Sequence, residues 1–203
     1  LIVGGASGED IAGNSNSGAA YLFKREANGT ITELGKLTHE DPKSSDQFGN
    51  SVAIENDIIA VGASSDDVLV SGSNRGDAGS VTLFKVDGAG NITRTATLTA
   101  PLPNSSSFFG VSVSISGNFL VIGEQRRSHI QNYSGAVYLY KINANGTTQL
   151  TATLHSPNPT NYGYFGFSVD LSGDRLVVGA YNENSEIASN SGSAYIYKVK
   201  PDG

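Results

Sequence analysis

Histidine is the side chain best suited to acid–base and metal chemistry near neutral pH, and this chain contains three histidines. His39, His129 and His155 lie too far apart for the His-x-x-x-His spacing that brings two imidazoles to one metal ion. His39 and His155 instead follow Leu37 and Leu154 at similar places in the chain. A loop residue that recurs in a repeat explains these two histidines more simply than catalysis does.

Paired carboxylates are the other arrangement that could support catalysis, as they do in glycosidases. Adjacent acids such as Glu9-Asp10 and Asp66-Asp67 could serve in this way, but neighbouring residues of an extended backbone point in opposite directions. Neither a Gly-x-Ser-x-Gly nucleophile motif nor a phosphate-binding glycine loop occurs. We therefore predict no catalytic residue, no metal ligand and no cofactor, and we expect a protein that is not an enzyme.

Aromatic side chains in loops can bind sugars or peptides without any catalytic group. Tyr162 and Tyr164 flank a glycine in a segment rich in turn-forming residues, and Tyr133 and Tyr181 occur in two other such segments. These four tyrosines are candidate ligand-binding residues. The simpler alternative is that each tyrosine packs beneath its own loop.

The tripeptide Arg75-Gly76-Asp77 matches the motif that integrins recognise in their ligands, so these three residues are also candidates for ligand binding. They lie in a long connecting segment, where a presented tip would be accessible. Glycine and aspartate are frequent in this chain, however, and Gly76 and Asp77 lead directly into the next apolar run. Chance occurrence is the simpler explanation of the tripeptide.

Charge and composition exclude several classes of partner. A formal net charge of −6 argues against nucleic acid, which requires basic surfaces. No stretch reaches the roughly 18 apolar residues of a membrane helix, so we expect no membrane insertion. The absence of cysteine removes disulfides, thiolate zinc sites and thiol catalysis.

The chain is built from an internal repeat. A Phe-Gly-x-Ser-Val pattern begins at Phe48, Phe109 and Phe165, which are 61 and 56 residues apart. A short turn and an apolar run ending in glycine follow each copy, and a fourth copy of that run occupies residues 1–5. After a variable loop, a glycine begins a strand that ends in lysine, and a Thr-rich strand completes the unit.

Each repeat is predicted to form four antiparallel strands, named A to D in chain order. Strand B is apolar on both faces, as expected for a strand buried between neighbouring sheets, whereas strands A and C alternate. Such units are typical of β-propeller blades; a β-sandwich would explain the strands but not the repeat. We predict an all-β propeller of four-stranded antiparallel blades. Its repeats cover about 1–47 (without strand A), 48–107, 108–164 and 165–203 (without strand D).

The Phe-Gly start of strand A and the Gly-Ala end of strand B resemble the FG-GAP repeat family, whose best-known members are the seven-bladed heads of integrin α subunits. The chain is more similar to the bacterial branch of that family, over its whole length. Many such repeats carry a calcium loop between strands A and B. Here that connection is only 55–57, 116–118 or 172–174, with too few oxygens for calcium. The resemblance implies the fold and is much less specific about function.

The repeat count predicts about three and a half blades, which is half of a seven-bladed ring. An open arc would leave sheet faces and edges uncovered. We expect the remaining blades to come from the same, longer chain, as the start in mid-strand suggests, or from a second copy.

The long loops all fall at one end of the blades, because strand direction alternates. They join strands B and C (6–17, 64–78, 124–134, 180–191) or strand D to the next strand A (38–47, 99–107, 155–164). These loops contain 11 acidic and 4 basic residues, against 8 acidic and 9 basic residues elsewhere. Negative charge is thus concentrated on this long-loop face. The face is either a solubilising surface or a site for a basic partner, a sugar or cations held between loops.

We expect a recognition or adhesion module, secreted or on a bacterial cell surface, that binds a protein or a glycan through the long-loop face. Two alternatives remain open. One is a carbohydrate-active enzyme, such as a polysaccharide lyase or hydrolase, with a site that spans further blades. The other is a structural subunit of a surface assembly.

Overall fold

The computed structural model describes residues 1–144, 146–185, 188–201 and 203, and within them it contains strands and turns but no helix. Blade 1 comprises β1 (Ile2–Ala6), β2 (Ala19–Arg25) and β3 (Ile31–Leu37). Blade 2 comprises β4 (Phe48–Glu55), β5 (Ile58–Ala63), β8 (Ser80–Val86) and β9 (Ile92–Thr99). Blade 3 comprises β10 (Phe109–Ser116), β11 (Phe119–Glu124), β12 (Ala136–Ile142) and β13 (Thr148–Leu154). Blade 4 comprises β14 (Phe165–Ser172), β15 (Arg175–Ala180) and β16 (Ser193–Lys198).

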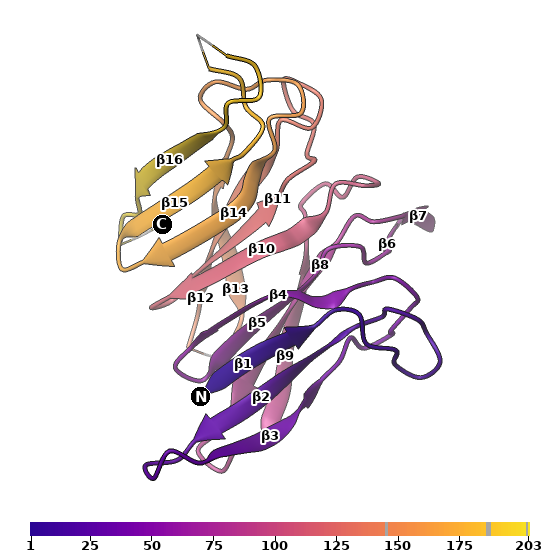
Figure 1. Cartoon of the computed structure of the whole chain (residues 1–203), viewed down its shortest axis with the longest axis vertical. Helices are drawn as coiled ribbons and strands as arrows, with labels where there is room; N and C mark the ends of the chain where they lie inside the picture. Colours follow the sequence, from indigo (N-terminus) through magenta and orange to yellow (C-terminus); the bar gives the residue numbers. More distant parts are fainter. Residues whose placement is uncertain (145, 186–187, 202) are drawn as a thin grey trace.

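The four antiparallel sheets stand face to face in chain order, with β1, β4, β10 and β14 side by side (Figure 1). A small hairpin of β6 (Val68–Val70) and β7 (Ser73–Arg75) projects from blade 2. The predicted all-β fold of antiparallel propeller blades is confirmed. The described residues form an open row of sheets, and the number of blades in a ring stays a prediction.

Every Phe-Gly pair forms a bulge at the start of strand A. The pairing of β10 with β11 breaks between Phe109 and Ser112, and the breaks in β4 and β14 fall at the same place. Gly110 has a φ of 83°, a left-handed conformation that glycine adopts without the steric cost of a side chain. The bulge turns the Gly110 carbonyl away from its own sheet, toward blade 2.

This displaced carbonyl fixes how closely two blades approach. The Ser51 hydroxyl of blade 2 donates a hydrogen bond of 2.7 Å to the Gly110 carbonyl, and Ser112 donates one of 2.9 Å to Gly166 in blade 4. A glycine of strand B faces the same oxygen. A Cβ atom at Gly123 would lie 1.9 Å from the Gly166 oxygen. Glycine is therefore required by contact between backbones of different blades.

Three hydrophobic clusters fill the spaces between successive blades. Phe48, Phe109 and Phe165 are fully buried at the same place in their respective clusters. Strand β5 contributes Ile59 to the cluster shared with blade 1 and Ala60 to the cluster shared with blade 3. This division explains why strand B is apolar on both faces.

A carboxylate that accepts a hydrogen bond from a strand-C tyrosine recurs in three blades. The pairs are Glu9–Tyr21, Glu124–Tyr138 and Glu183–Tyr195. Glu124 and Glu183 are fully buried. Burial raises the pKa of Glu124 above its usual value, because the charged form loses its hydration.

Because strand-B glycines contact the bulge carbonyls, we expect that a methyl group added at such a glycine destabilises the fold. Gly123→Ala should lower the free energy of unfolding by about 1–3 kcal/mol, the usual cost of overpacking. Gly4→Ala, also in strand B, is the matched control, because its Cβ would meet no atom within 4 Å. Urea denaturation followed by circular dichroism measures both changes. Equal stability of the two variants would contradict the proposed role of Gly123.

Glu124 predicts a pH dependence of stability. Its pKa is raised on folding, so this group favours the folded state most at low pH, and that contribution is lost as pH rises through the folded pKa. Between pH 5 and 8 the wild type should lose more stability than Glu124→Gln, which stays neutral and still accepts the Tyr138 bond. Glu33→Gln, at an exposed position of β3, is the control. Parallel pH profiles of wild type and Glu124→Gln would refute the assignment.

Candidate functional site

The long-loop face is organised by a backbone contact between loops of successive blades, which we call the inter-blade bridge. The segment before each Phe-Gly bulge donates amide hydrogen bonds to the segment before strand C of the preceding blade. Between blades 3 and 4 these bonds run from Tyr162 to Asn132 (2.8 Å), from Tyr164 to Tyr133 (3.1 Å) and from Phe165 to Ser134 (3.0 Å). Equivalent bonds run from Phe48 to Ser17 and from Phe109 to Ala78. Each junction therefore has the same pattern of backbone hydrogen bonds between its loops.

The bridge imposes an uncommon backbone conformation on three of the predicted tyrosines. Tyr133, Tyr162 and Tyr164 have φ angles of 51°, 60° and 54°, in the left-handed region that large residues rarely adopt. The corresponding residues between blades 2 and 3 share it: Asp77, Ser106 and Phe108, with φ of 53°, 56° and 57°. The conformation thus belongs to the junction and not to tyrosine, and the surrounding hydrogen bonds maintain it.

All four predicted tyrosines lie in one row, the tyrosine row (Tyr133, Tyr162, Tyr164 and Tyr181). Successive ring centroids are 5.4, 6.4 and 5.2 Å apart, and the rings of Tyr164 and Tyr181 are nearly parallel, at 9°. Tyr162 is 48% exposed and Tyr181 52% exposed. Tyr162 thus contacts Tyr133 of another loop, and Tyr164 contacts Tyr181 of another loop. Ligand binding by the row stays a prediction.

Two residues that the sequence analysis missed extend the row toward blade 2. The guanidinium carbon of Arg126 lies 4.7 Å from the centroid of Phe108 and 5.8 Å from that of Tyr133. Arg126 thus joins the aromatic residues of two junctions by cation–π contacts. Phe108 had a sequence signal, because it precedes its Phe-Gly pair as Tyr164 does. Arg126 had none.

The tyrosine row has two parts. One part lies between two neighbouring blades, and the other lies at the outer edge of blade 4. Tyr133, Tyr162 and Tyr164 lie at the junction of blades 3 and 4. Phe167, which contacts Tyr181 at 4.6 Å, occupies the repeat position of Asn50. Asn50 donates a hydrogen bond to the following blade, so this position faces a neighbour elsewhere in the chain. The junction tyrosines are therefore the part of the row whose surroundings are complete.

The Arg75-Gly76-Asp77 tripeptide lies at the base of the β6–β7 hairpin. The tip of that hairpin is formed by Ser71 and Gly72. The Asp77 amide donates to the Asp67 carboxylate at 3.0 Å, and all three residues of the tripeptide are half-buried. The structure therefore uses this backbone within the fold and does not present it at a tip.

Fewer acids face solvent on the long-loop face than the residue count implies. Four of its eleven acids are buried: Asp46, Asp66, Glu124 and Glu183. Glu9 is half-buried and bonded to Lys36 and Tyr21. Glu186 lies outside the described residues. The acidic side chains of this face thus lie partly inside the loops and partly at their surface.

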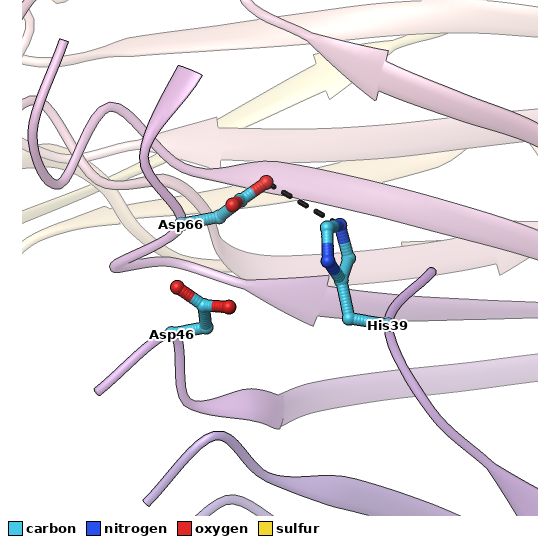
Figure 2. A group of neighbouring side chains, drawn as sticks. All are labelled: His39, Asp46 and Asp66. Carbon is cyan, nitrogen blue, oxygen red and sulfur yellow. Dashed lines mark ion pairs between the residues drawn. The ribbon is translucent and has the colours of Figure 1, made fainter. Parts of the chain in front are cut away.

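Two of the buried acids form a cluster with His39 (Figure 2). The imidazole Nε2 of His39 lies 3.5 Å from Oδ2 of Asp66. Burial raises the pKa of Asp46 to about 6, and the nearby charge of Asp66 adds to this rise. No motif spacing in the sequence pointed to this cluster, because its members come from separate loop segments.

His39 and His155 do not occupy the same repeat position. Aligning Leu37 with Leu154, which pair with equivalent residues of strand C, shifts the two histidines by one residue. His155 stacks on His129 at a centroid distance of 4.0 Å. Burial lowers the pKa of His155, and the adjacent His129 adds to the effect. These two imidazoles belong to a different junction from His39.

Comparison with known proteins supports the repeat. The profile of the FG-GAP repeat matches residues 31–84, 92–140 and 148–197, which is more than half of the chain. Each match begins with strand D of one blade and ends in strand C of the next. No curated protein matches the chain in sequence.

The family has a characteristic range of roles. FG-GAP repeats are typical of adhesion and recognition propellers, occur in extracellular or surface proteins, and form a generally non-enzymatic fold. Within the described residues, no helix has the length and apolar character needed to cross a membrane. Three matched repeats, the Phe-Gly bulges and the successive antiparallel blades show that this chain belongs to the FG-GAP repeat family.

Proposed function

We propose that this chain is a recognition or adhesion module, secreted or displayed at the cell surface, that binds a protein or a glycan through its long-loop face. The observation that supports this proposal is the tyrosine row on that face. Tyr162, at its centre, is nearly half exposed although its backbone is held by the inter-blade bridge. Loops that a rigid scaffold positions are where binding residues concentrate.

The backbone of the row is ordered before a ligand arrives. Tyrosine offers a large amphipathic surface with only two side-chain torsions to restrict. The bridge bonds to Asn132 and Tyr133 already fix the main chain of Tyr162 and Tyr164. Binding then costs less conformational entropy than it would for a flexible loop.

The row combines ring faces, phenolic hydroxyls and the guanidinium of Arg126. Such a surface suits ligands that carry apolar faces and hydrogen-bonding groups side by side. Sugar rings and peptide loops both have this character. The side chains of the tyrosine row, and not the half-buried Arg75-Gly76-Asp77 tripeptide, are the residues we expect to contact the ligand.

Further blades are the second kind of partner that we propose. The outer face of blade 4 exposes Val177 at 40% and Ile196 at 73%, and blade 1 exposes Ile2 at 41% and Ile31 at 57%. Between blades 2 and 3, the equivalent sheet faces are covered by the neighbouring sheet. We propose that additional blades, from the same longer chain or from a second copy, cover these two faces.

The proposal predicts a localised loss of binding. The protein is screened against arrays of glycans and of surface proteins, and the affinity for each ligand found is compared between variants. Tyr162→Ala should weaken binding at least tenfold, because a central aromatic anchor contributes about 2 kcal/mol or more. Leu69→Ala is the control, since Leu69 is 70% exposed on the β6–β7 hairpin of the same face.

Two results would count against recognition by the row. The first is that the wild-type protein binds nothing on the glycan array or on the protein array. The second is a ligand whose affinity is unchanged in Tyr162→Ala, with the fold of the variant verified by circular dichroism.

A further inference from the structure

The cluster of His39, Asp46 and Asp66 brings three potential metal ligands together where two blades meet. His39 and Asp46 lie in the connection from β3 to β4, and Asp66 lies between β5 and β6. One donor atom of each residue lies within 4.8 Å of those of the other two. Asp46 is 2% exposed and Asp66 6% exposed, and Figure 2 shows Asp66 and His39 directed at one another.

Blade 4 shows how the repeat normally accommodates an acid at the position of Asp66. There the acid is Glu183, whose amide donates to Ala180 as that of Asp66 donates to Ala63. The Glu183 carboxylate accepts hydrogen bonds from Ser156 at 2.5 Å and from Tyr195 at 2.9 Å. Two hydroxyl donors therefore satisfy this buried carboxylate.

Blade 2 has neither the tyrosine nor the serine donor at the equivalent positions around Asp66. The position of the tyrosine is taken by Thr82, whose hydroxyl is buried without a hydrogen-bond partner among the described residues. The position of the serine is taken by His39. The Asp66 carboxylate is thus more than nine-tenths buried, and its contact with His39 is the one charged or polar contact found for it within the described residues. Buried charges in proteins are paired with another charge or coordinate a metal ion.

The orientation of His39 exposes a metal-binding nitrogen to this carboxylate. Nδ1 of His39 lies 3.1 Å from the Asp41 carbonyl, which can only accept, so Nδ1 carries the proton. In the neutral imidazole, Nε2 then presents a lone pair toward Asp66. A hydrogen bond from imidazole Nδ1 to a backbone carbonyl is the usual outer-shell support of a histidine that binds metal through Nε2.

The second acid completes the set. Asp46 accepts a hydrogen bond from the Lys43 amide through Oδ2, at 2.6 Å, which holds its carboxylate in place beside the other two residues. Ser107 and Gly163 occupy the corresponding positions of the next two junctions, as counted from Phe109 and Phe165. The combination of two acids and one imidazole is thus specific to the junction of blades 1 and 2.

We propose that His39, Asp46 and Asp66 bind a divalent transition-metal ion of the Zn²⁺ type. Ligand atoms about 2.0–2.2 Å from a tetrahedral zinc ion lie about 3.4 Å from one another, and Nε2 of His39 and Oδ2 of Asp66 are 3.5 Å apart. The imidazole favours zinc over calcium and magnesium, which prefer oxygen ligands. Three protein ligands leave a fourth position for water or a ligand group.

The bound ion would fasten the blade 1–blade 2 connection to the body of blade 2. His39 and Asp46 stand at the two ends of that connection, and Asp66 follows β5. Because the ligands come from separate segments, the unfolded chain would hold the ion more weakly, so binding would stabilise the folded protein.

Calorimetric titration of chelator-treated protein with Zn²⁺ tests the proposal. The wild type should bind one ion per chain, and Asp66→Asn and His39→Gln should each weaken binding at least tenfold. Co²⁺ should give the visible bands of a tetrahedral site in the wild type and not in these variants. Millimolar Ca²⁺ or Mg²⁺ should leave the Zn²⁺ titration unchanged.

Two control variants separate this cluster from other histidines and acids. Glu183→Gln changes the equivalent acid of blade 4, and His129→Ala removes one ring of the stacked imidazole pair; both should bind Zn²⁺ as the wild type does. The proposal is overturned if the wild type does not bind Zn²⁺. It is also overturned if Asp66→Asn retains full affinity, or if only His129→Ala loses it.

Discussion

The distance between neighbouring blades is limited by contact between backbones, where a glycine of strand B meets the carbonyl of the next Phe-Gly bulge. The oxygen of Gly166 lies where any side chain at Gly123 would begin, and the Gly110 oxygen has the same relation to Gly62. A serine hydroxyl of strand A satisfies each of these carbonyls. The strand-B glycine of one blade and the Phe-Gly glycine of the next are therefore partners across an interface.

The same contact determines what the long-loop face can display. The residues just before each bulge pair with the preceding blade, so their side chains project from a fixed main chain. Their identity is free to change from junction to junction, as Gln47, Phe108 and Tyr164 show. One junction thereby carries the tyrosines that we propose for recognition, and another carries the His39 cluster that we assign to a metal ion. A backbone arrangement that repeats at every junction while its side chains vary suits a recognition scaffold.

The sequence was sufficient for the fold and for half of the candidate site. Spacing of the Phe-Gly pairs revealed the blades, because bulge and glycine are local features. The four tyrosines could be nominated one by one, but their contacts depend on how adjacent blades align. The count of acidic residues assigned Glu124 and Glu183 to the surface. In the structure both carboxylates are buried and accept hydrogen bonds from the hydroxyls of Tyr138 and Tyr195. The ligands around Asp66 escaped notice because separate segments supply them.

The claim on which this account depends is that backbone bonds between blades fix the loops. Hydrogen–deuterium exchange at the amides of Phe109, Tyr164 and Phe165 tests it directly, since each donates to the preceding blade. The account predicts protection comparable to that of Val121 in the centre of β11. Exchange of these three amides within seconds, as in exposed loops, would contradict it.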